Sequence, residues 1–468
     1  MTLYPLIPGA KLVRFVFEES SRPLSRVVTF GIISGIAGGG ILAAINQGAQ
    51  MAAGSLTIQP LLLFSGVLAL FLYSKRYSLI NAVMAVEEML QAVRNRVAGK
   101  IADSELEAME RIGPSYVFNR LSQDTILISD SAHVIFASFG ALIMLVFSTI
   151  YIAIISLEGF IMTLSAISLG VITFLSQRRA IIGAVRSATS NEVEFLASVE
   201  QSLNGFKEIK LHRGKADDLL RSQAAIGGTL ERAKKRAGRS QTFVMMFSQA
   251  FFYALLGVVV FVWPVVMDES TETVIKVTAT ILFIIGPIDL VVGSMPLFME
   301  ADVAVENLKE LERRLEAGVM KAPAKPLDPA APFVGLQIKD VKYRYPGDYD
   351  ETEFTLGPIN LEVTPGEILF IVGGNGSGKS TLLKILTGLY YPTDGEVLVD
   401  GSRLERSDYP QYRQSFSAIF TDFFLFDRLY GVSPAVYGRA DDLLKWLDIS
   451  RKTTFDNGGF TNRNLSTG

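Results

Sequence analysis

The sequence GGNGSGKS, Gly373–Ser380, decides the fold of the C-terminal part of this chain. It matches the pattern Gly-x-x-x-x-Gly-Lys-Ser/Thr in full. An apolar stretch, Glu367–Val372, precedes it, and a stretch of helix-forming residues, Thr381–Leu389, follows it. Strand, glycine-rich loop and helix in this order are typical of a phosphate-binding loop, in which backbone N–H groups and the positive helix N-terminus hold phosphate oxygens. We therefore expect an α/β nucleotide-binding domain, with Glu367–Val372 as a buried strand.

The residues of this loop have separate expected roles. Its glycines allow a close approach of the backbone to phosphate, which a side chain would block. Lys379 would bring a positive charge to the β- and γ-phosphates, and the Ser380 hydroxyl would hold Mg²⁺. The nucleotide-binding residues expected here are Gly373, Gly374, Asn375, Gly376, Ser377, Gly378, Lys379, Ser380 and Thr381.

The composition excludes an ordinary soluble protein. Of the 468 residues 49% are hydrophobic and 19% are charged, with a mean hydropathy of +0.33, which indicates several membrane spans. The absence of cysteine excludes disulfides and thiol chemistry, and two histidines are too few for a histidine metal site. The net charge of -3 gives no reason to expect a nucleic-acid partner.

Six apolar stretches come close to the length needed to cross a bilayer, since a helix needs about 20 residues to span about 30 Å. They are Val27–Ile45, Ile58–Tyr73, Val134–Leu157, Phe160–Leu175, Phe243–Val266 and Val274–Phe298. The sequence SLEG between the third and the fourth indicates a tight hairpin. Buried helices of a large soluble core are the alternative, but the stretches are too many and too uncharged for it.

The positions of Lys and Arg predict the orientation of these spans. Both residue types are abundant between spans two and three and between spans four and five, and are missing from the other three connections. Since Lys and Arg favour the cytoplasmic side, both termini are expected in the cytoplasm of a protein of the inner (plasma) membrane. The two basic connections are long and rich in helix formers, so we expect the membrane helices to continue into the cytoplasm, turn and return.

Composition divides the chain into four segments. Residues 1–26 form a cytoplasmic or interfacial segment, in which KLVRFVFEESSRPLSR suits a helix on the inner leaflet or a plain amphipathic leader. Residues 27–315 form the six-helix transmembrane domain with long cytoplasmic extensions. The charged sequence ENLKELERRLEAG predicts a helix with a C-cap at Gly318. Residues 316–332 are rich in proline and predict an extended linker, and residues 333–468 form the nucleotide-binding domain.

From Phe333 onward the chain resembles the nucleotide-binding domain of ATP-binding cassette (ABC) proteins. The sequence VKYRYP resembles the aromatic loop of that family, which implies that Tyr345 stacks on adenine; an ordinary strand aromatic is the alternative. The sequence GLYYPTDGEVLVDG, with turns at Asp394-Gly395 and Asp400-Gly401 around a short strand, resembles the stretch that follows the phosphate loop. The resemblance implies ATP and Mg²⁺ as cofactors.

The membrane part agrees with this family. The sequences RIGPSYVFNRLSQDTILIS and LNGFKEIKLHRGK are similar to the cytoplasmic coupling regions of ABC exporters, and six spans before one cassette is the layout of an exporter half-transporter. The segment FSAIFTDFFLF is most similar to exporters of cyclic peptides and siderophores, of the pyoverdine and syringomycin type. This implies a homodimeric transport ATPase that exports a peptide-like cargo across the bacterial inner membrane. A lipid flippase, a multidrug exporter and a membrane-bound regulatory ATPase without transport stay as alternatives.

Two features depart from the family pattern. Thr421 stands where the family has a glutamine that contacts Mg²⁺; the following Asp422 would reach the metal through a water, or would only cap a turn. The sequence NLSTG resembles the family signature, with Thr467 in place of its first glycine, which implies that Ser466 and Gly468 cover a γ-phosphate bound by the partner subunit. The Walker B aspartate, the catalytic glutamate and the switch histidine would lie beyond residue 468. We therefore expect a truncated or incomplete chain that does not turn over ATP.

One acidic residue lies inside a predicted span. Asp289 occurs in GPIDLVVGSMP, where Pro287 and Pro296 would kink the helix. A carboxylate is costly inside a membrane, so Asp289 is a candidate cargo-binding residue; a structural hydrogen bond or a place near the membrane edge is the alternative.

Overall fold

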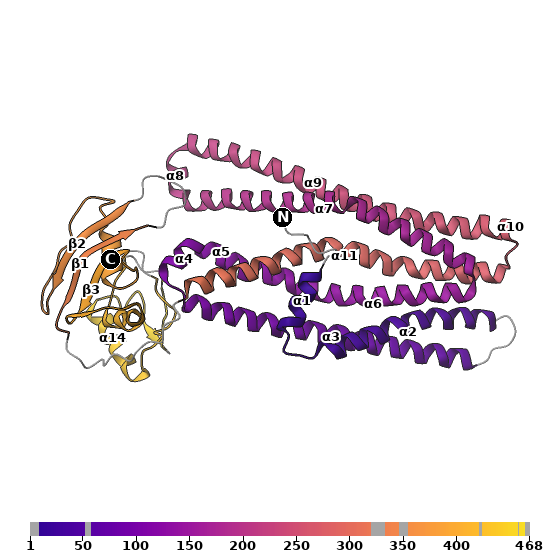
Figure 1. The fold of residues 1–468 in the computed structure, drawn as a ribbon, viewed down its shortest axis with the longest axis horizontal. Helices are drawn as coiled ribbons and strands as arrows, with labels where there is room; N and C mark the ends of the chain where they lie inside the picture. The colour runs from indigo at the N-terminus through magenta and orange to yellow at the C-terminus, as the bar shows by residue number, and fades with distance from the viewer. Residues whose placement is uncertain are drawn as a thin grey trace. The chain divides into compact units, whose positions relative to one another are not determined.

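The computed structural model describes residues 9–51, 58–319, 333–345, 354–420, 424–456 and 458–463. The chain divides into two compact units, residues 1–320 and 321–468. Among the described residues, the first unit is built from helices and the second from a sheet with short helices (Figure 1). Of the predicted proline-rich linker, residues 320–332 lie outside these ranges.

Long helices joined by short turns make up the first unit (Figure 1). Their bounds are α1 Ala10–Glu19, α2 Leu24–Met51, α3 Ile58–Ala102, α4 Leu106–Ile112, α5 Pro114–Asn119, α6 Thr125–Ile155, α7 Leu157–Asn204, α8 Phe206–Leu211, α9 Arg213–Gly257, α10 Trp263–Met267 and α11 Thr271–Gly318, with π-helical turns at Arg120–Asp124 and Val258–Val262. Within the described part of the chain, six helical segments are long and apolar enough to cross a membrane. They contain the six predicted spans, apart from the last two residues of the third.

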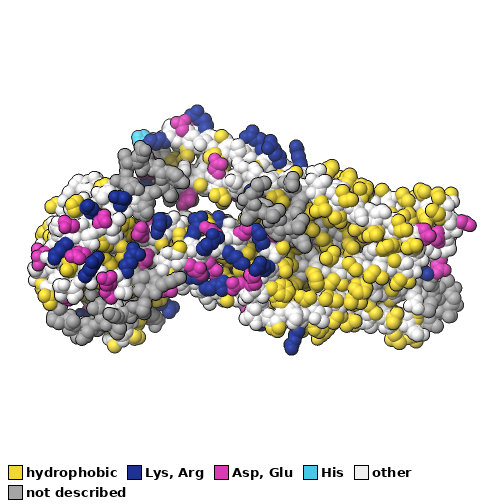
Figure 2. Space-filling model, viewed as in Figure 1, with side chains coloured by type: hydrophobic (Ala, Val, Ile, Leu, Met, Phe, Trp, Pro, Cys, Tyr) yellow, Lys and Arg dark blue, Asp and Glu magenta, His cyan; other side chains and the backbone are white. Residues whose placement is uncertain are grey.

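The helices extend well past their apolar parts. The second predicted span ends at Tyr73, whereas α3 continues to Ala102. The fourth predicted span ends at Leu175, whereas α7 continues to Asn204, where the short α8 connects it to α9. Apolar side chains cover the end of the bundle that carries α10, whereas Lys and Arg gather toward the other half of these helices (Figure 2). The helices thus continue past the apolar stretches and turn, as expected, whereas the position of these extensions in the cytoplasm stays a prediction.

The connection between α6 and α7 is tighter than predicted, because Ser156 alone separates the two helices. The Ser156 hydroxyl accepts a hydrogen bond from the backbone N–H of Gly159 at 3.2 Å and donates one to Glu158 at 2.9 Å. Most of the SLEG sequence is therefore the capped first turn of α7 rather than a loop.

The N-terminal helix α1 packs on the bundle. Its side chains Leu12, Phe15 and Val16 are buried in a core that also contains residues of α3, α6 and α11. Asp302 of α11 accepts hydrogen bonds from the backbone N–H groups of Gly9 and Leu12, both at 2.9 Å. The apolar side chains Leu12, Phe15 and Val16 of α1 therefore contact protein and not lipid. Contact of α1 with the membrane surface stays a prediction for the exposed side of this helix only.

The charged sequence ENLKELERRLEAG is not a separate helix but the end of α11, which continues through Pro287 and Pro296. The helix ends at Gly318 as expected, but Gly318 is the last helical residue and Val319 is the C-cap. A Cβ atom at Gly318 would lie 2.4 Å from Cβ of Ala108, and the Glu105 backbone N–H donates to the Gly318 carbonyl at 3.1 Å. The glycine therefore allows the close approach of α4.

A row of glycines brings α2 close to α6. A Cβ atom at Gly35 would lie 2.5 Å from Cγ2 of Ile143, and one at Gly39 would lie 3.1 Å from Cβ of Phe147. Small residues spaced four apart allow membrane helices to pack at short range. Ser138 of α6 and Ser294 of α11 share a hydrogen bond of 3.1 Å, so α6 is held on both sides.

The second unit contains a four-stranded antiparallel sheet in the order β2-β1-β3-β4. The bounds are β1 Leu336–Arg344, β2 Thr355–Val363, β3 Asp394–Val399, β4 Ser402–Arg403, α12 Lys379–Leu386, α13 Tyr409–Tyr412, α14 Tyr437–Trp446, β5 Phe455–Asp456 and β6 Gly459–Phe460. β1 buries alternate residues, among them Leu336, Ile338 and Tyr343. β3 runs from Asp394 to Val399 and ends before the turn at Asp400-Gly401, which confirms the short strand predicted there. The turn predicted at Asp394-Gly395 is wrong, because both residues belong to β3.

The predicted buried strand Glu367–Val372 is not a strand in the structure. Its side chains at Ile368, Phe370 and Val372 are 80%, 82% and 92% exposed. No strand among the described residues pairs with this segment. Without a neighbouring ladder its backbone groups have no sheet partner and its side chains have nothing to pack on, so this part of the prediction is wrong.

Candidate nucleotide-binding site

The phosphate loop takes a backbone conformation that requires glycine at two positions. Gly376 has φ of +77° and Gly378, the residue before α12, has φ of +89°, a region that other residues rarely adopt. A Cβ atom at Gly378 would also lie 2.6 Å from Cδ1 of Leu356 on β2. The backbone conformation therefore requires glycine at position 376, and both conformation and packing require it at position 378.

The loop is open to solvent. Its residues Gly373, Gly374, Asn375, Gly376 and Ser377 are all exposed, and a Cβ atom at Gly374 or Gly376 would meet nothing within 4 Å. The first N–H groups of α12 have no partner within that helix and point toward the loop. This arrangement can accept an anion such as phosphate.

Lys379, the first residue of α12, lies back over this loop. Its ammonium donates hydrogen bonds to the carbonyl oxygens of Gly373 at 2.9 Å and Gly374 at 2.7 Å. The positive charge is thus held beside the exposed loop N–H groups, where an anion would arrive. A phosphate oxygen, which carries more charge than a carbonyl oxygen, can replace these two partners.

Ser380 fits a limited role in binding Mg²⁺. Its side chain is exposed on the first turn of α12, and its hydroxyl has no hydrogen bond within the part of the chain that the structure describes. The described residues contain no group of three or more His, Cys, Asp or Glu that could hold a metal. Mg²⁺ is commonly held by one or two protein oxygens together with substrate phosphates and waters. Ser380 therefore fits Mg²⁺ that arrives with a triphosphate.

Tyr345 makes a hydrogen bond to α12, the helix that follows the phosphate loop. Its hydroxyl lies 2.7 Å from the Oγ1 atom of Thr381, the residue after Ser380. The ring packs edge-on against Tyr343, with a centroid distance of 5.1 Å, and remains 38% exposed. The structure thus brings Tyr345 and the phosphate loop together and leaves part of the ring available to a planar base.

A second set of side chains, which the sequence did not single out, holds α12 in place. Lys384 lies 4.6 Å from the ring centroid of Tyr390 and donates to its hydroxyl at 3.1 Å. Tyr390 stacks on Tyr343 at 4.9 Å. Lys384 follows Lys379 by five residues in an ordinary helical stretch, so no sequence signal marked it. Tyr390 belongs to the GLYYP sequence, which carried the family resemblance but no role.

The buried residues Tyr409 and Tyr412 support the far end of α12. Tyr412 donates a hydrogen bond from its hydroxyl to the carbonyl of Leu386, the last residue of that helix. Burial raises the pKa of Tyr409 to about 12 and also raises the pKa of Tyr412. Both phenols therefore stay neutral at physiological pH, as a buried hydroxyl donor must.

Other predicted residues lie elsewhere. Thr421, Asp422, Ser466 and Gly468 fall outside the described residues. Asp289 belongs to the first unit, where its Oδ2 atom accepts a hydrogen bond of 3.0 Å from Gln249 of α9. This is the structural hydrogen bond that the sequence left open as an alternative to cargo binding.

Residues 356–468 match the family model for ABC transporters. These residues form an ABC transporter domain. It is 28% identical over 439 residues to the ATP-binding protein SyrD of Pseudomonas syringae pv. syringae, which covers 89% of this chain and 75% of SyrD. It is 28% identical over 263 residues to the ATP-dependent lipid A-core flippase of Paraburkholderia xenovorans, covering 54% of this chain and 42% of the flippase. It is 26% identical over 226 residues to the subtilin transport ATP-binding protein SpaT of Bacillus subtilis, covering 47% of this chain and 36% of SpaT.

These matches agree with the architecture. Six apolar helices followed by a unit with a phosphate loop form the fold of an ABC exporter half-transporter, as the sequence predicted. The matched domain implies ATP binding, and the open loop at Gly373–Gly378 is the candidate site for it. The chain spans three quarters of the length of SyrD and less than half of the length of the other two relatives.

Proposed function

We propose that this half-transporter is an ATP-driven exporter that works as a dimer of two copies in the bacterial inner membrane. The observation that carries the proposal is the hydrogen bond between Tyr345 and Thr381. It fixes an aromatic ring to the same helix turn that carries Lys379 and Ser380. A base-stacking group that is hydrogen-bonded to the helix with the phosphate-binding group suits a nucleoside triphosphate, and six apolar helices precede them.

Each residue of the site would act on a different part of ATP. Tyr345 stacks on the adenine ring, and the loop N–H groups hold the phosphate oxygens. Lys379 exchanges its bonds to the Gly373 and Gly374 carbonyls for bonds to the β- and γ-phosphates. Mg²⁺, held in part by Ser380, would neutralise charge on those phosphates.

Closure of two nucleotide-binding units on ATP would drive transport. A ligand shifts a conformational equilibrium only if it binds one state better than the other, and ATP shared between two copies has this property. Ser466 and Gly468 would cover the γ-phosphate bound by the partner copy, and Asp422 would reach Mg²⁺ through a water. Both termini would lie in the cytoplasm, as the distribution of Lys and Arg favours.

A peptide-like cargo, of the cyclic or siderophore type, is our proposal for what is exported. The segment FSAIFTDFFLF and the similarity to SyrD over 89% of this chain support it, as does the similarity to SpaT, whose name states transport of subtilin. The match to lipid A-core flippases, over about half of this chain, favours a lipid flippase as the second candidate. Asp289 stays a proposed cargo contact, next to Pro287 and Leu290.

Transport into sealed, inverted membrane vesicles from cells that produce the full-length protein tests this function. We expect ATP-dependent uptake of a labelled cyclic peptide, lost in Lys379→Ala and retained in Lys445→Ala, a matched change of an exposed lysine on α14. Uptake of labelled lipid but not of peptide would favour the flippase. ATP hydrolysis without uptake of either would replace the proposal with a regulatory ATPase.

A further inference from the structure

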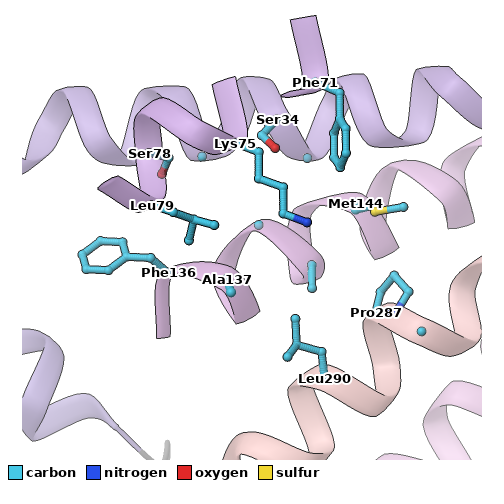
Figure 3. Close-up of a pocket in the computed structure, with 15 residues that line it drawn as sticks. Ser34, Phe71, Lys75, Ser78, Leu79, Phe136, Ala137, Met144, Pro287 and Leu290 are labelled. Atoms are coloured by element: carbon cyan, nitrogen blue, oxygen red, sulfur yellow. The ribbon is translucent and has the colours of Figure 1, made fainter. Parts of the chain in front are cut away.

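A cavity of about 290 Å³ lies among α2, α3, α6 and α11 of the membrane unit (Figure 3). Its walls are formed largely by apolar and small residues, among them Phe71, Met144 and Leu290. A Cβ atom at Gly140 or at Gly286 would meet no atom within 4 Å. Glycine at these two positions therefore leaves open space in the cavity.

Lys75 is the charged residue among those that line this cavity. Its side chain leaves α3 and extends into the space between α3 and the side where Met144 and Pro287 lie (Figure 3). The ammonium lies 5.3 Å from the ring centroid of Phe71. Within the described parts of the chain, Lys75 makes no ion pair or hydrogen bond, and no Asp or Glu lines the cavity. The residue is exposed, so a solute can reach the charge.

Two serines of the cavity differ in what they can offer a ligand. The Ser78 hydroxyl donates to the carbonyl of Val27 at 2.9 Å, so its proton is already used. Ser34 is buried and lines the same cavity, and its hydroxyl has no hydrogen bond to any residue that the structure describes. Ser34 therefore has a donor to give.

We propose that this cavity binds a single carboxylate group of an apolar cargo, with the Lys75 ammonium as its counter-charge and Ser34 as a hydroxyl donor. This inference rests on the proposed export function and narrows its cargo. The Lys75 ammonium can be reached by a solute and meets no Asp or Glu among the residues that line the cavity, so the cavity favours an anion.

Charge and size select the kind of anion. One ammonium balances a carboxylate, whereas a phosphate monoester carries close to two charges at neutral pH and would leave one of them unpaired. The volume is at the lower limit of about 300 Å³ for pockets that enclose a small ligand. It holds a residue-sized part of a peptide with its carboxylate, and it is too small for the paired acyl chains of a phospholipid.

Binding of two fluorescent probes to the purified, detergent-solubilised protein tests the proposal. N-dansyl-phenylalanine carries a carboxylate on an apolar body, and its amide has the same body without the charge. We expect the wild-type protein to bind the acid at least about tenfold more tightly than the amide, as for a charge-assisted hydrogen bond. Lys75→Gln should remove this preference, and Lys75→Arg should keep most of it.

Arg76→Gln is the matched control, because it removes a positive charge from the next residue, which does not line the cavity. It should leave the preference unchanged, with gel filtration confirming that each variant is folded. Equal binding of both probes, binding of neither, or a preference that survives in Lys75→Gln overturns the proposal. So does displacement of the acid by short-chain phosphatidylglycerol at lower concentration than by unlabelled N-acetyl-phenylalanine. Binding is measured without ATP, so failure here leaves export untouched, whereas failure of vesicle uptake leaves the acid preference intact.

Discussion

The hydroxyl groups of Tyr345 and Thr381 lie 2.7 Å apart, which joins the end of β1 to the first turn of α12. The sequence separates these residues by 36 positions, and the loop of eight residues that ends at Ser380 lies between them along the chain. The contact couples the position of an aromatic ring to the position of the phosphate loop.

Two substitutions of Tyr345 separate the contribution of its hydroxyl to ATP binding from the contribution of its ring. Tyr345→Phe should weaken ATP binding about fivefold, since one neutral hydrogen bond contributes about 1 kcal/mol. Tyr345→Ala should weaken it at least about tenfold, because base stacking is also lost. Calorimetric titration with ATP and Mg²⁺ measures both, and Tyr430→Phe, an exposed tyrosine, serves as control. Equal losses in the Phe and Ala variants would argue against stacking.

The glycines of the phosphate loop should differ in their tolerance of a methyl group. Gly378→Ala places Cβ at 2.6 Å from Leu356 in a left-handed conformation, which should cost about 2–4 kcal/mol of unfolding free energy. Gly374→Ala meets nothing within 4 Å and should change stability by less than about 0.5 kcal/mol. Denaturant unfolding of both variants, followed by tyrosine fluorescence, compares them directly, and similar midpoints would contradict the assigned geometry.

The close packing of α2 and α6 gives a prediction for the membrane unit. Gly35→Ala brings Cβ to 2.5 Å from Ile143, and forcing the helices apart should destabilise the unit by about 1–3 kcal/mol. Gly48→Ala, on the same helix with nothing within 4 Å, is the matched control. We expect a lower midpoint of thermal unfolding in detergent for the first variant only.

Arg96 ties three helices together at the charged end of the bundle. It donates hydrogen bonds to Glu19 of α1 at 2.7 Å and to Glu312 of α11 at 2.8 Å. Arg96→Met removes both ion pairs but keeps an apolar stem, so α1 should detach more often and be cleaved faster by protease near Ser20. Arg14→Met, which breaks an ion pair within α1 itself, should not have this effect. High salt weakens ion pairs, so it should reduce the difference in cleavage rate between the wild-type protein and Arg96→Met.

The buried tyrosines predict how stability depends on pH at the alkaline end. The folded-state pKa of Tyr409 is about 12, above the unfolded value of about 10, so the neutral form is favoured in the folded state. The resulting stability is fully present below pH about 10 and is lost as pH rises toward 12. Denaturation midpoints between pH 8 and 12 should fall less steeply for Tyr409→Phe than for wild type.

Features that depend on a continuous stretch of residues were predictable. The six spans follow from the length of apolar runs, and the phosphate loop follows from eight adjacent residues, because the backbone conformation at Gly376 and Gly378 needs glycine. Tyr345 became a candidate residue only through the family resemblance.

Features that depend on distant residues were not. A strand needs a neighbour to share its hydrogen bonds, so the apolar pattern of Glu367–Val372 alone could not establish one. Residue 318 must be glycine because Ala108, some two hundred positions earlier in the sequence, packs directly against it. Lys75 entered the sequence argument only as one positive charge after an apolar run, since four separate helices must meet before its cavity exists.

The uninterrupted course of α11 has a mechanical consequence. Its 48 residues correspond to a rod about 72 Å long at 1.5 Å per residue. A tilt of about 5° around one end would sweep the other through about 6 Å, by the same length. A tilt of about 5° around Gly286 would displace Gly318, about 48 Å further along the same helix, by about 4 Å, without any bending of the helix.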